Sequence, residues 1–228
     1  MKIFNREFFK FYNLIKDGEN FAFCKFADGE WSALIGSNVN NGEFESSEYH
    51  LKQRALLLRA FRFQNPYYYV GISCRCCQGS DHERMKLSSG QKEENLTFAN
   101  LWVNSNYELT KNLLFDLFRT KKVILFANKD STIESLPFKL EQFVRISYNA
   151  WIEDINILDT FPILQYQNCL FLFCAGPFGN ILTHHFWTRN PYNQYVDVGS
   201  ILNPFLGSEG FRRGYFDGKN SGKFCVWG

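Results

Sequence analysis

Hydrophobic residues follow two spacings along the chain, one typical of helices and one typical of buried strands. Residues 3–17 place aromatic and aliphatic side chains about one helical turn apart, which predicts an amphipathic helix ending at Asp17-Gly18. Short runs that are apolar throughout predict strands that are covered on both faces of a sheet. Strands are expected at residues 21–26, 67–74, 122–127, 143–147, 169–174 and 195–199, and several of these runs are apolar throughout.

The segments between these strands divide into further helices and polar loops. Little hydrophobic pattern appears in residues 37–47 and 75–94, so both are predicted to be loops. The second is long for a loop in a compact domain, and such loops often carry function. Helical spacing predicts helices that start at Trp31, cover residues 48–64, 96–119 and 150–165, and begin again near Asn180.

Strands that alternate with helices in this way predict an α/β fold. Because several strands are apolar throughout, we expect a Rossmann-like, mostly parallel sheet with helices on both faces. A single domain over residues 1–205 accounts for all of these elements. Residues 206–228 are rich in glycine, aromatic and basic residues, and we expect them to form a C-terminal flap or arm.

Composition and charge narrow the class of protein. Hydrophobic residues make up 45% and aromatic residues 18% of the chain, which supplies enough burial for an ordered domain. The formal net charge is only +2 and no long basic run occurs, so nucleic-acid binding is not expected.

The distribution of charges and cysteines indicates the cellular compartment of the protein. Charges interrupt the apolar residues near the N-terminus, and no apolar run is long enough to span a membrane. Seven cysteines in a chain without an export signal are expected to be reduced thiols. We therefore expect a cytoplasmic protein, or one in the host cytoplasm if the source is a virus. Assembly into a homodimer is left open.

The tripeptide Asp28-Gly29-Glu30 follows the first predicted strand. Its two carboxylates offer the oxygen ligands that Mg²⁺ and Mn²⁺ prefer. Gly29 between them would let a phosphate or a sugar approach the backbone closely. The alternative is a strand-to-helix turn, in which Asp28 caps the helix and Glu30 occupies its first turn. The triplet alone does not decide between these interpretations.

A second candidate lies at residues 175–180, where a strand runs through a glycine-bearing turn into a helix. The start of such a helix can bind anions, although Pro177 removes one backbone donor. The three-glycine fingerprint of nicotinamide-binding proteins is absent. An ordinary tight turn explains the segment equally well.

The predicted loop 75–94 offers titratable groups. Asp81, His82 and Glu83 are candidates for a general base. Cys74, Cys76 and Cys77 with His82 suggest zinc, but their spacing does not match paired zinc knuckles. Asp197 ends the last predicted strand, at the edge of the sheet where ligands bind in open parallel sheets.

Residues 23–31, followed by Leu34-Ile35-Gly36, resemble the opening motif of the glycosyltransferases with the GT-D fold, the DUF1792 group. The segment 195–199 resembles a later block of the same family. The resemblance spans most of the chain, from the first strand to Gly199. It departs from the family pattern at Lys25 and Ala27, where the family often has Arg and Gly, and at Ser200, where some members have His.

The resemblance implies a hexosyl- or pentosyltransferase that moves a sugar from a nucleoside diphosphate, expected to be UDP, to a hydroxyl of a glycan or glycoconjugate. Asp28 and Glu30 would hold Mn²⁺ or Mg²⁺, as the family's D-x-E residues do. We expect the nucleotide-sugar donor to contact residues at the ends of the strands, namely Phe26, Gly29, Asn128, Lys129, Gly176, Gly179 and Asn180. Two alternatives stay open: a Rossmann-type methyltransferase that uses the turn at 176–180, and a non-catalytic nucleotide-sugar-binding module.

Overall fold

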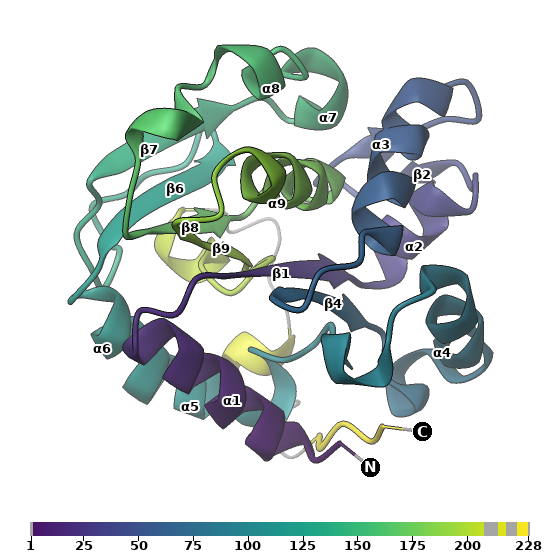
Figure 1. Ribbon diagram of the computed structural model, residues 1–228, viewed down its shortest axis with the longest axis horizontal. Coiled ribbons are helices and arrows are strands. Elements are labelled where there is room, and N and C mark those ends of the chain that lie inside the picture. The colour runs from purple at the N-terminus through teal and green to yellow at the C-terminus, as the bar shows by residue number, and fades with distance from the viewer. Residues whose placement is uncertain (1, 208–213, 218–222, 228) are drawn as a thin grey trace.

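A seven-stranded parallel sheet forms the centre of the computed structural model, which describes residues 2–207, 214–217 and 223–227 (Figure 1). The strands are β1 (Phe21–Phe26), β4 (Tyr68–Ile72), β5 (Leu96–Phe98), β6 (Lys122–Asn128), β7 (Gln142–Ile146), β8 (Cys169–Phe173) and β9 (Gln194–Asp197). They lie in the order β5-β4-β1-β9-β8-β6-β7, and each neighbouring pair is parallel. All of their carboxyl ends therefore meet at one edge.

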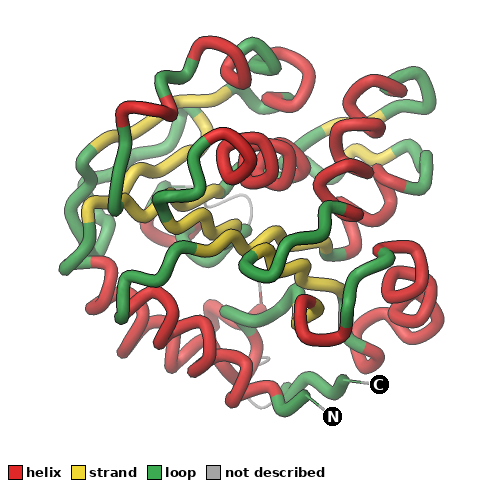
Figure 2. The backbone as a smooth tube through the Cα atoms, in the orientation of Figure 1, coloured by secondary structure: helices red, strands yellow, loops and turns green. Residues whose placement is uncertain are grey.

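Helices cover both faces of this sheet, as Figures 1 and 2 show. On the upper face in these views lie α3 (Leu51–Arg62), α7 (Ala150–Glu153), α8 (Ile157–Thr160) and α9 (Pro177–Arg189). On the lower face lie α1 (Phe4–Lys16), α5 (Tyr107–Leu109) and α6 (Phe115–Phe118). The helices α2 (Asp28–Leu34) and α4 (Arg75–Ser89) follow β1 and β4 directly. The predicted fold class, a Rossmann-like α/β sheet covered on both faces, is confirmed.

Two hydrophobic cores, one on each face, explain why strands such as β8 are apolar throughout. In β8, Phe171 and Phe173 belong to the core that contains Phe186 of α9. Leu170 and Leu172 of the same strand point the other way, into the core beneath α1 and α6. Successive side chains of a strand alternate between faces, so a strand that is covered twice needs no polar position.

The N-terminal helix shows the corresponding pattern for one buried face. Phe8, Phe11 and Ile15 of α1 are fully buried, at the spacing that aligns side chains along a helix. Phe11 packs against Phe23 of β1 with 5.2 Å between ring centroids. The predicted helix over 3–17 is confirmed, and so are all six predicted strands, with shifts of at most two residues at their ends.

The prediction of a loop over residues 75–94 was wrong, because most of this segment is α4. The helix has a weak hydrophobic pattern since it buries only His82, Met85 and Ser89. Gln78 and Gly79 also leave helical geometry near its start. Weak periodicity and an internal break together removed the helical signal.

Other corrections concern short elements. Leu96–Phe98 is the edge strand β5, where a helix over 96–119 was predicted. Residues 39–46 form a hairpin of β2 (Val39–Asn40) and β3 (Glu45–Ser46) inside a predicted loop. The helix expected over 150–165 is broken into α7, α8 and a short 3₁₀ turn at Ile163–Gln165. α2 begins at Asp28, three residues before the expected start at Trp31.

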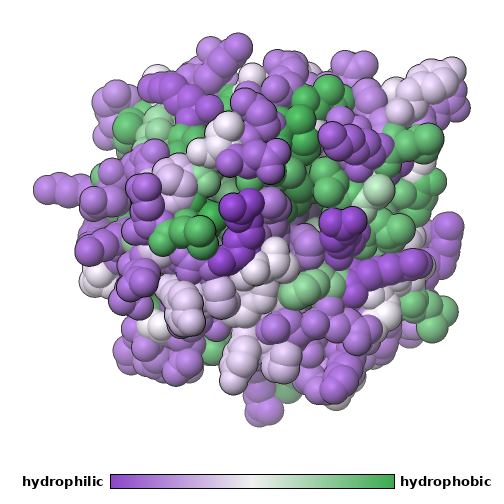
Figure 3. Space-filling model, turned by 45° about the horizontal axis from the view of Figure 1, so that its top comes forward, coloured by the Kyte–Doolittle hydropathy of each residue, from purple (hydrophilic) through white to green (hydrophobic). Residues whose placement is uncertain are grey.

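The C-terminal segment lies partly outside the described residues. Leu206 is buried, and Cys225 and Trp227 are 1% and 3% exposed, so these parts pack against the domain. No helix in the described ranges has both the length and the apolar character to cross a membrane. In the view of Figure 3, hydrophobic side chains reach the surface in separate patches among hydrophilic ones.

Truncating the β8 side chain Leu172 tests the double-core architecture. Leu172 is fully buried in the centre of the sheet, so Leu172→Ala should lower the free energy of unfolding by about 2–5 kcal/mol. The matched change Leu87→Ala removes the same atoms from a side chain that is 82% exposed on α4, and should cost less than about 0.5 kcal/mol. Urea denaturation measures both values. Equal losses of unfolding free energy in the two variants would contradict the burial of Leu172 in the core.

Candidate functional site

A cavity of about 930 Å³ lies at the carboxyl edge of the sheet. Residues that follow β1, β5, β6, β7, β8 and β9 line it, as does the tip of the β2–β3 hairpin. Three of the segments in which the sequence predicted site residues reach the cavity, namely 27–30, 128–130 and 175–180. A fourth segment, from Arg75 onward, does not line it, because Cys74 turns directly into α4.

The Asp28-Gly29-Glu30 triplet forms the first turn of α2, with Ala27 as the residue that precedes the helix. Glu30 Oε2 accepts a hydrogen bond from the Ala27 backbone N–H at 3.0 Å, and the Glu30 side chain is largely buried. Glu30 thus lies in the first turn, as the helix-capping interpretation expected, whereas Asp28 is the first residue of the helix and does not cap it. Asp28 is exposed on the wall of the cavity, so the two carboxylates have different surroundings.

Lys25 lies beside this turn and carries the positive charge of the site. Its Nζ is 3.7 Å from Glu30 Oε2. Burial would lower the pKa of Lys25, but four carboxylates outweigh burial and raise it above its ordinary value. In decreasing order of effect, these carboxylates belong to Glu30, Asp197, Asp28 and Glu43. The ammonium therefore stays charged and neutralises part of an acidic cavity.

Asp197 ends β9 and is 2% exposed at the bottom of the cavity. Burial raises the pKa of its carboxyl to about 7, and the charge of Glu30 acts in the same direction. The Lys25 ammonium opposes this rise, as do hydrogen bonds from backbone N–H groups, including that of Gly199 at 2.9 Å. Near neutral pH this carboxyl can therefore gain or lose a proton.

Two residues of the predicted donor site pack against the charged groups instead, Asn180 against Lys25 and Gly179 against Asp197. Asn180 is fully buried, and its Nδ2 donates to the Lys25 carbonyl oxygen at 2.7 Å, which ties α9 to the end of β1. Gly179 lies beside Asp197, where an added Cβ would stand 3.6 Å from Asp197 Oδ2. Gly199 has a φ of +56°, and a Cβ there would lie 3.1 Å from Lys25 Cε.

Gly29 and Gly176 both make room for the same aromatic ring. A Cβ on Gly29 would approach the Phe44 ring to 3.3 Å, and one on Gly176 would approach it to 3.0 Å. Phe44 follows the hairpin tip, where Asn41 Oδ1 accepts the backbone N–H groups of Glu43 and Phe44. The glycines therefore allow the hairpin to pack against both turns, which gives a structural reason for residues that the sequence assigned to donor contact.

The turn before α9 offers fewer anion donors than the sequence indicated. Pro177 has no N–H, and the N–H groups of Phe178 and Gly179 donate to the carbonyls of Ala175 and Gly176 at 3.2 and 3.0 Å. Of the residues predicted there, Gly176 lines the cavity, whereas Gly179 and Asn180 do not.

The remaining predicted residues divide between the cavity and other places. Asn128 lines the cavity, and its Oδ1 accepts the Asp130 backbone N–H at 2.9 Å. Lys129 is exposed beside the cavity without lining it, and Phe26 is fully buried against Phe61.

Asp81, His82 and Glu83 lie on α4 and do not line the cavity. His82 is fully buried, with Nδ1 2.8 Å from the Ser73 carbonyl oxygen and its ring edge against Trp227. Asp81 forms an ion pair with Arg84 on the same helix. These surroundings give none of the three access to a substrate in the cavity.

Several residues of the cavity were missed at the level of sequence. Lys25 stood inside the recognised motif, at a position where the family often has Arg, and that basic position was the available signal. Asn41, Glu43, Asn100 and Tyr148 come from a short hairpin and from segments after β5 and β7, and each lines the cavity. Single polar residues in short loops carry no pattern that would separate them from the solvated surface.

Comparison with known proteins gives matches in structure. A DUF1792 domain described as having a distinct glycosyltransferase fold superposes with a TM-score of 0.61 at 17% identity, over 85% of this chain and 77% of that one. A glycosyltransferase (DUF1792) from Streptococcus sanguinis superposes with a TM-score of 0.59 at 15% identity, over 87% and 80% of the two chains. No protein-family model matches the sequence, and no curated protein matches it. The chain therefore has the fold of the DUF1792 structures, as the resemblance implied.

The raised pKa of Asp197 predicts how stability depends on pH. Its carboxyl titrates near pH 4 in an unfolded chain and near pH 7 in the folded protein, so between these values only the folded state holds the proton. Its contribution to stability is thus complete below about pH 4 and is lost as the pH rises to about 7. The unfolding free energy of the wild type should fall relative to that of Asp197→Asn by at most ~4 kcal/mol over this range. Denaturant titrations at several pH values measure the difference, and a difference that does not change with pH would contradict it.

Proposed function

We propose that this protein is a glycosyltransferase that binds a nucleotide-sugar donor in the cavity at the carboxyl edge of its sheet. The observation that carries the proposal is the lysine–carboxylate group formed by Lys25, Asp28, Glu30 and Asp197, which lies at the cavity of a chain with the DUF1792 fold. The DUF1792 structures are described as having a glycosyltransferase fold, and one of them as a glycosyltransferase. A donor diphosphate needs positive charge to bind, and a sugar hydroxyl needs a base that removes its proton.

The residues of the triplet fit a hard divalent cation. Asp28 offers an exposed carboxylate to the cavity, and Glu30 lines the same wall although its Oε2 already accepts the Ala27 N–H. Within the described ranges, no three carboxylates gather closely enough to enclose one ion. Mg²⁺ characteristically binds one or two carboxylates and completes its shell with phosphate oxygens and water. Asp28, with Glu30, would therefore hold Mg²⁺ or Mn²⁺ together with the donor.

Such an ion would neutralise charge that develops on the leaving diphosphate. Lys25 contributes a second positive charge, fixed by Glu30 and by the buried surroundings of β1. The donor phosphates would be held by Asn128, at the end of β6, and by the backbone at Gly176, which follows the neighbouring strand β8. UDP is the nucleotide that the family resemblance favours.

The acceptor hydroxyl needs a group that removes its proton. Asp197 suits this role, because it borders the cavity and its pKa of about 7 lies near a working pH. Lys25 stabilises its ionised form, so a base is available next to the expected donor. The acceptor would be a glycan or a glycoconjugate.

Neutralising Asp28 tests the site. Asp28→Asn keeps the size of the side chain but removes its charge, and should lower metal-dependent donor hydrolysis or sugar transfer by at least ~100-fold. The matched variant Asp159→Asn changes an exposed carboxylate on α8, outside the cavity, and should keep wild-type activity. Product release from a panel of UDP- and GDP-sugars with Mn²⁺ is the measurement. Full activity of Asp28→Asn would refute the proposed site.

Ligand binding separates the proposed class from its rivals. A UDP-sugar with Mn²⁺ should raise the melting temperature, since a ligand at a hundredfold excess over its Kd stabilises by ~2.7 kcal/mol. S-adenosylmethionine should leave the melting temperature unchanged. A shift with S-adenosylmethionine alone would favour a methyltransferase. A shift with a UDP-sugar but no turnover with any acceptor or water would favour a binding module.

A further inference from the structure

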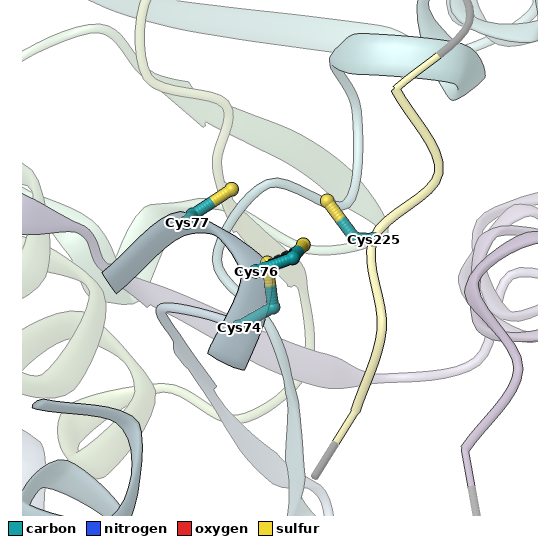
Figure 4. A group of neighbouring side chains, drawn as sticks. All are labelled: Cys74, Cys76, Cys77 and Cys225. Atoms are coloured by element: carbon teal, nitrogen blue, oxygen red, sulfur yellow. Dashed lines mark hydrogen bonds between the residues drawn. The ribbon is translucent and has the colours of Figure 1, made fainter. Parts of the chain in front are cut away.

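Four cysteine sulfur atoms converge outside the cavity. Cys74, Cys76, Cys77 and Cys225 each contribute one sulfur, and the four atoms lie within 4.8 Å of one another. Figure 4 shows the first three at the beginning of α4 and Cys225 on the C-terminal segment opposite them. The sulfurs of Cys74 and Cys76 are 3.2 Å apart. We call this group the cysteine cluster.

Local backbone geometry brings three of these sulfurs together. Cys74 precedes α4 in an extended conformation, and the N–H groups of Cys77 and Gln78 both donate to its carbonyl oxygen at 3.0 Å. Gln78 and Gly79 then depart from helical geometry, with a φ of +28° at Gly79. The first turn is therefore separate from the rest of α4, which allows neighbouring cysteines to face one point.

Contacts on both sides hold the fourth cysteine in place. Val226 pairs with Ile3 across an isolated β-bridge, and the Trp227 indole N–H donates to Glu93 Oε1 at 2.7 Å. The Trp227 ring also packs against His82 and Phe98, with 5.0 Å between ring centroids in each case. Before Cys225, the Lys223 carbonyl oxygen accepts a hydrogen bond from the Ser105 backbone N–H at 3.2 Å, so anchored residues lie on both sides of this cysteine.

The distances between the sulfurs indicate which metal the cysteine cluster can bind. Zinc–sulfur bonds of about 2.3 Å in a tetrahedron place the sulfurs about 3.8 Å apart, and the four sulfurs here all lie within 4.8 Å of one another, with one pair at 3.2 Å. An iron–sulfur cluster would need a wider arrangement, because its cysteines bind different iron atoms. Four thiolates around one point are typical of a structural zinc site with no open position.

Groups around the cluster suit negatively charged sulfur. Asn100 Nδ2 donates to Cys77 Sγ and Asn104 Nδ2 donates to Cys225 Sγ, each at 3.3 Å. The Lys223 ammonium lies beside the Cys77 sulfur. Four thiolates bound to one Zn²⁺ carry a net negative charge. Hydrogen bonds from amides and a nearby cation commonly stabilise such thiolates.

We propose that Cys74, Cys76, Cys77 and Cys225 form a structural Zn²⁺ site that fastens the C-terminal segment to the start of α4. Binding of Zn²⁺ by the four thiols releases their protons to solvent and involves no oxidation. The site also borders the cavity, because Asn100 both lines the cavity and donates to Cys77. Zinc would therefore stabilise that part of the cavity wall as well.

The zinc content of the full chain, purified in reducing buffer, tests this proposal. Elemental analysis should find about one zinc per chain in the wild type. Cys76→Ser changes an exposed side chain that the fold does not need, and should bind zinc at least tenfold more weakly, as should Cys225→Ser. The matched control Cys169→Ser alters a buried cysteine of β8 outside the cluster and should keep the wild-type zinc content. Circular dichroism would establish that each variant is folded.

Cobalt substitution supplies a second readout that does not depend on activity. Co²⁺ added to the metal-free wild type should give the sulfur-to-cobalt charge-transfer band and the intense d–d absorption of a tetrahedral thiolate site, and Cys76→Ser should weaken both. The proposal would be overturned by a reduced wild type that takes up neither Zn²⁺ nor Co²⁺. Unchanged zinc uptake in folded Cys76→Ser and Cys225→Ser would also overturn it. So would a disulfide to Cys225 found by mass spectrometry in a metal-free protein.

Discussion

The arrangement of the cavity depends on the charge of the half-buried Lys25 ammonium. Glu30, Asp197, Asp28 and Glu43 all act on it, and without a cation these carboxylates would repel one another at the edge of the sheet. The position of Lys25 also depends on the backbone that carries it. Lys25 needs a β1 that ends at a fixed place, and the buried amide of Asn180 holds that end from α9. A single charge thus links three elements that are far apart in the sequence.

Packing around the same lysine accounts for glycines that looked like ligand contacts. Gly199 leaves space for the Lys25 methylenes, and Gly29 and Gly176 leave space for Phe44. A glycine beside a predicted phosphate site has two explanations, and only the neighbouring side chains decide between them. Here they assign the glycines to close packing of the hairpin and of Lys25, while the charged groups are left facing the cavity.

The sequence predicted the parts of the fold whose signal is local. β8 and the interior of β6 are apolar because both faces of each are covered, and α1 shows one buried stripe. α4 was missed because it buries only three side chains and breaks at Gly79, and β5 because three residues carry no periodicity. Within the site, Asp28, Asn128 and Asp197 could be placed from strand ends, whereas the tip of the hairpin could not, since tertiary contacts alone bring Asn41 there.

The cysteine cluster and the triplet differ in the chemistry that they offer to metals. Thiolates are soft ligands that favour zinc in a closed tetrahedron, whereas carboxylates and phosphates are hard ligands that favour magnesium or manganese with exchangeable positions. Sequence spacing could not reveal the cysteine cluster, because its fourth cysteine, Cys225, is far away in the sequence. The nearby His82 instead packs against Trp227. The two proposed sites therefore need not compete for one ion. A closed sulfur site suits the fastening of a terminal segment, and an open oxygen site suits a donor that must enter and leave.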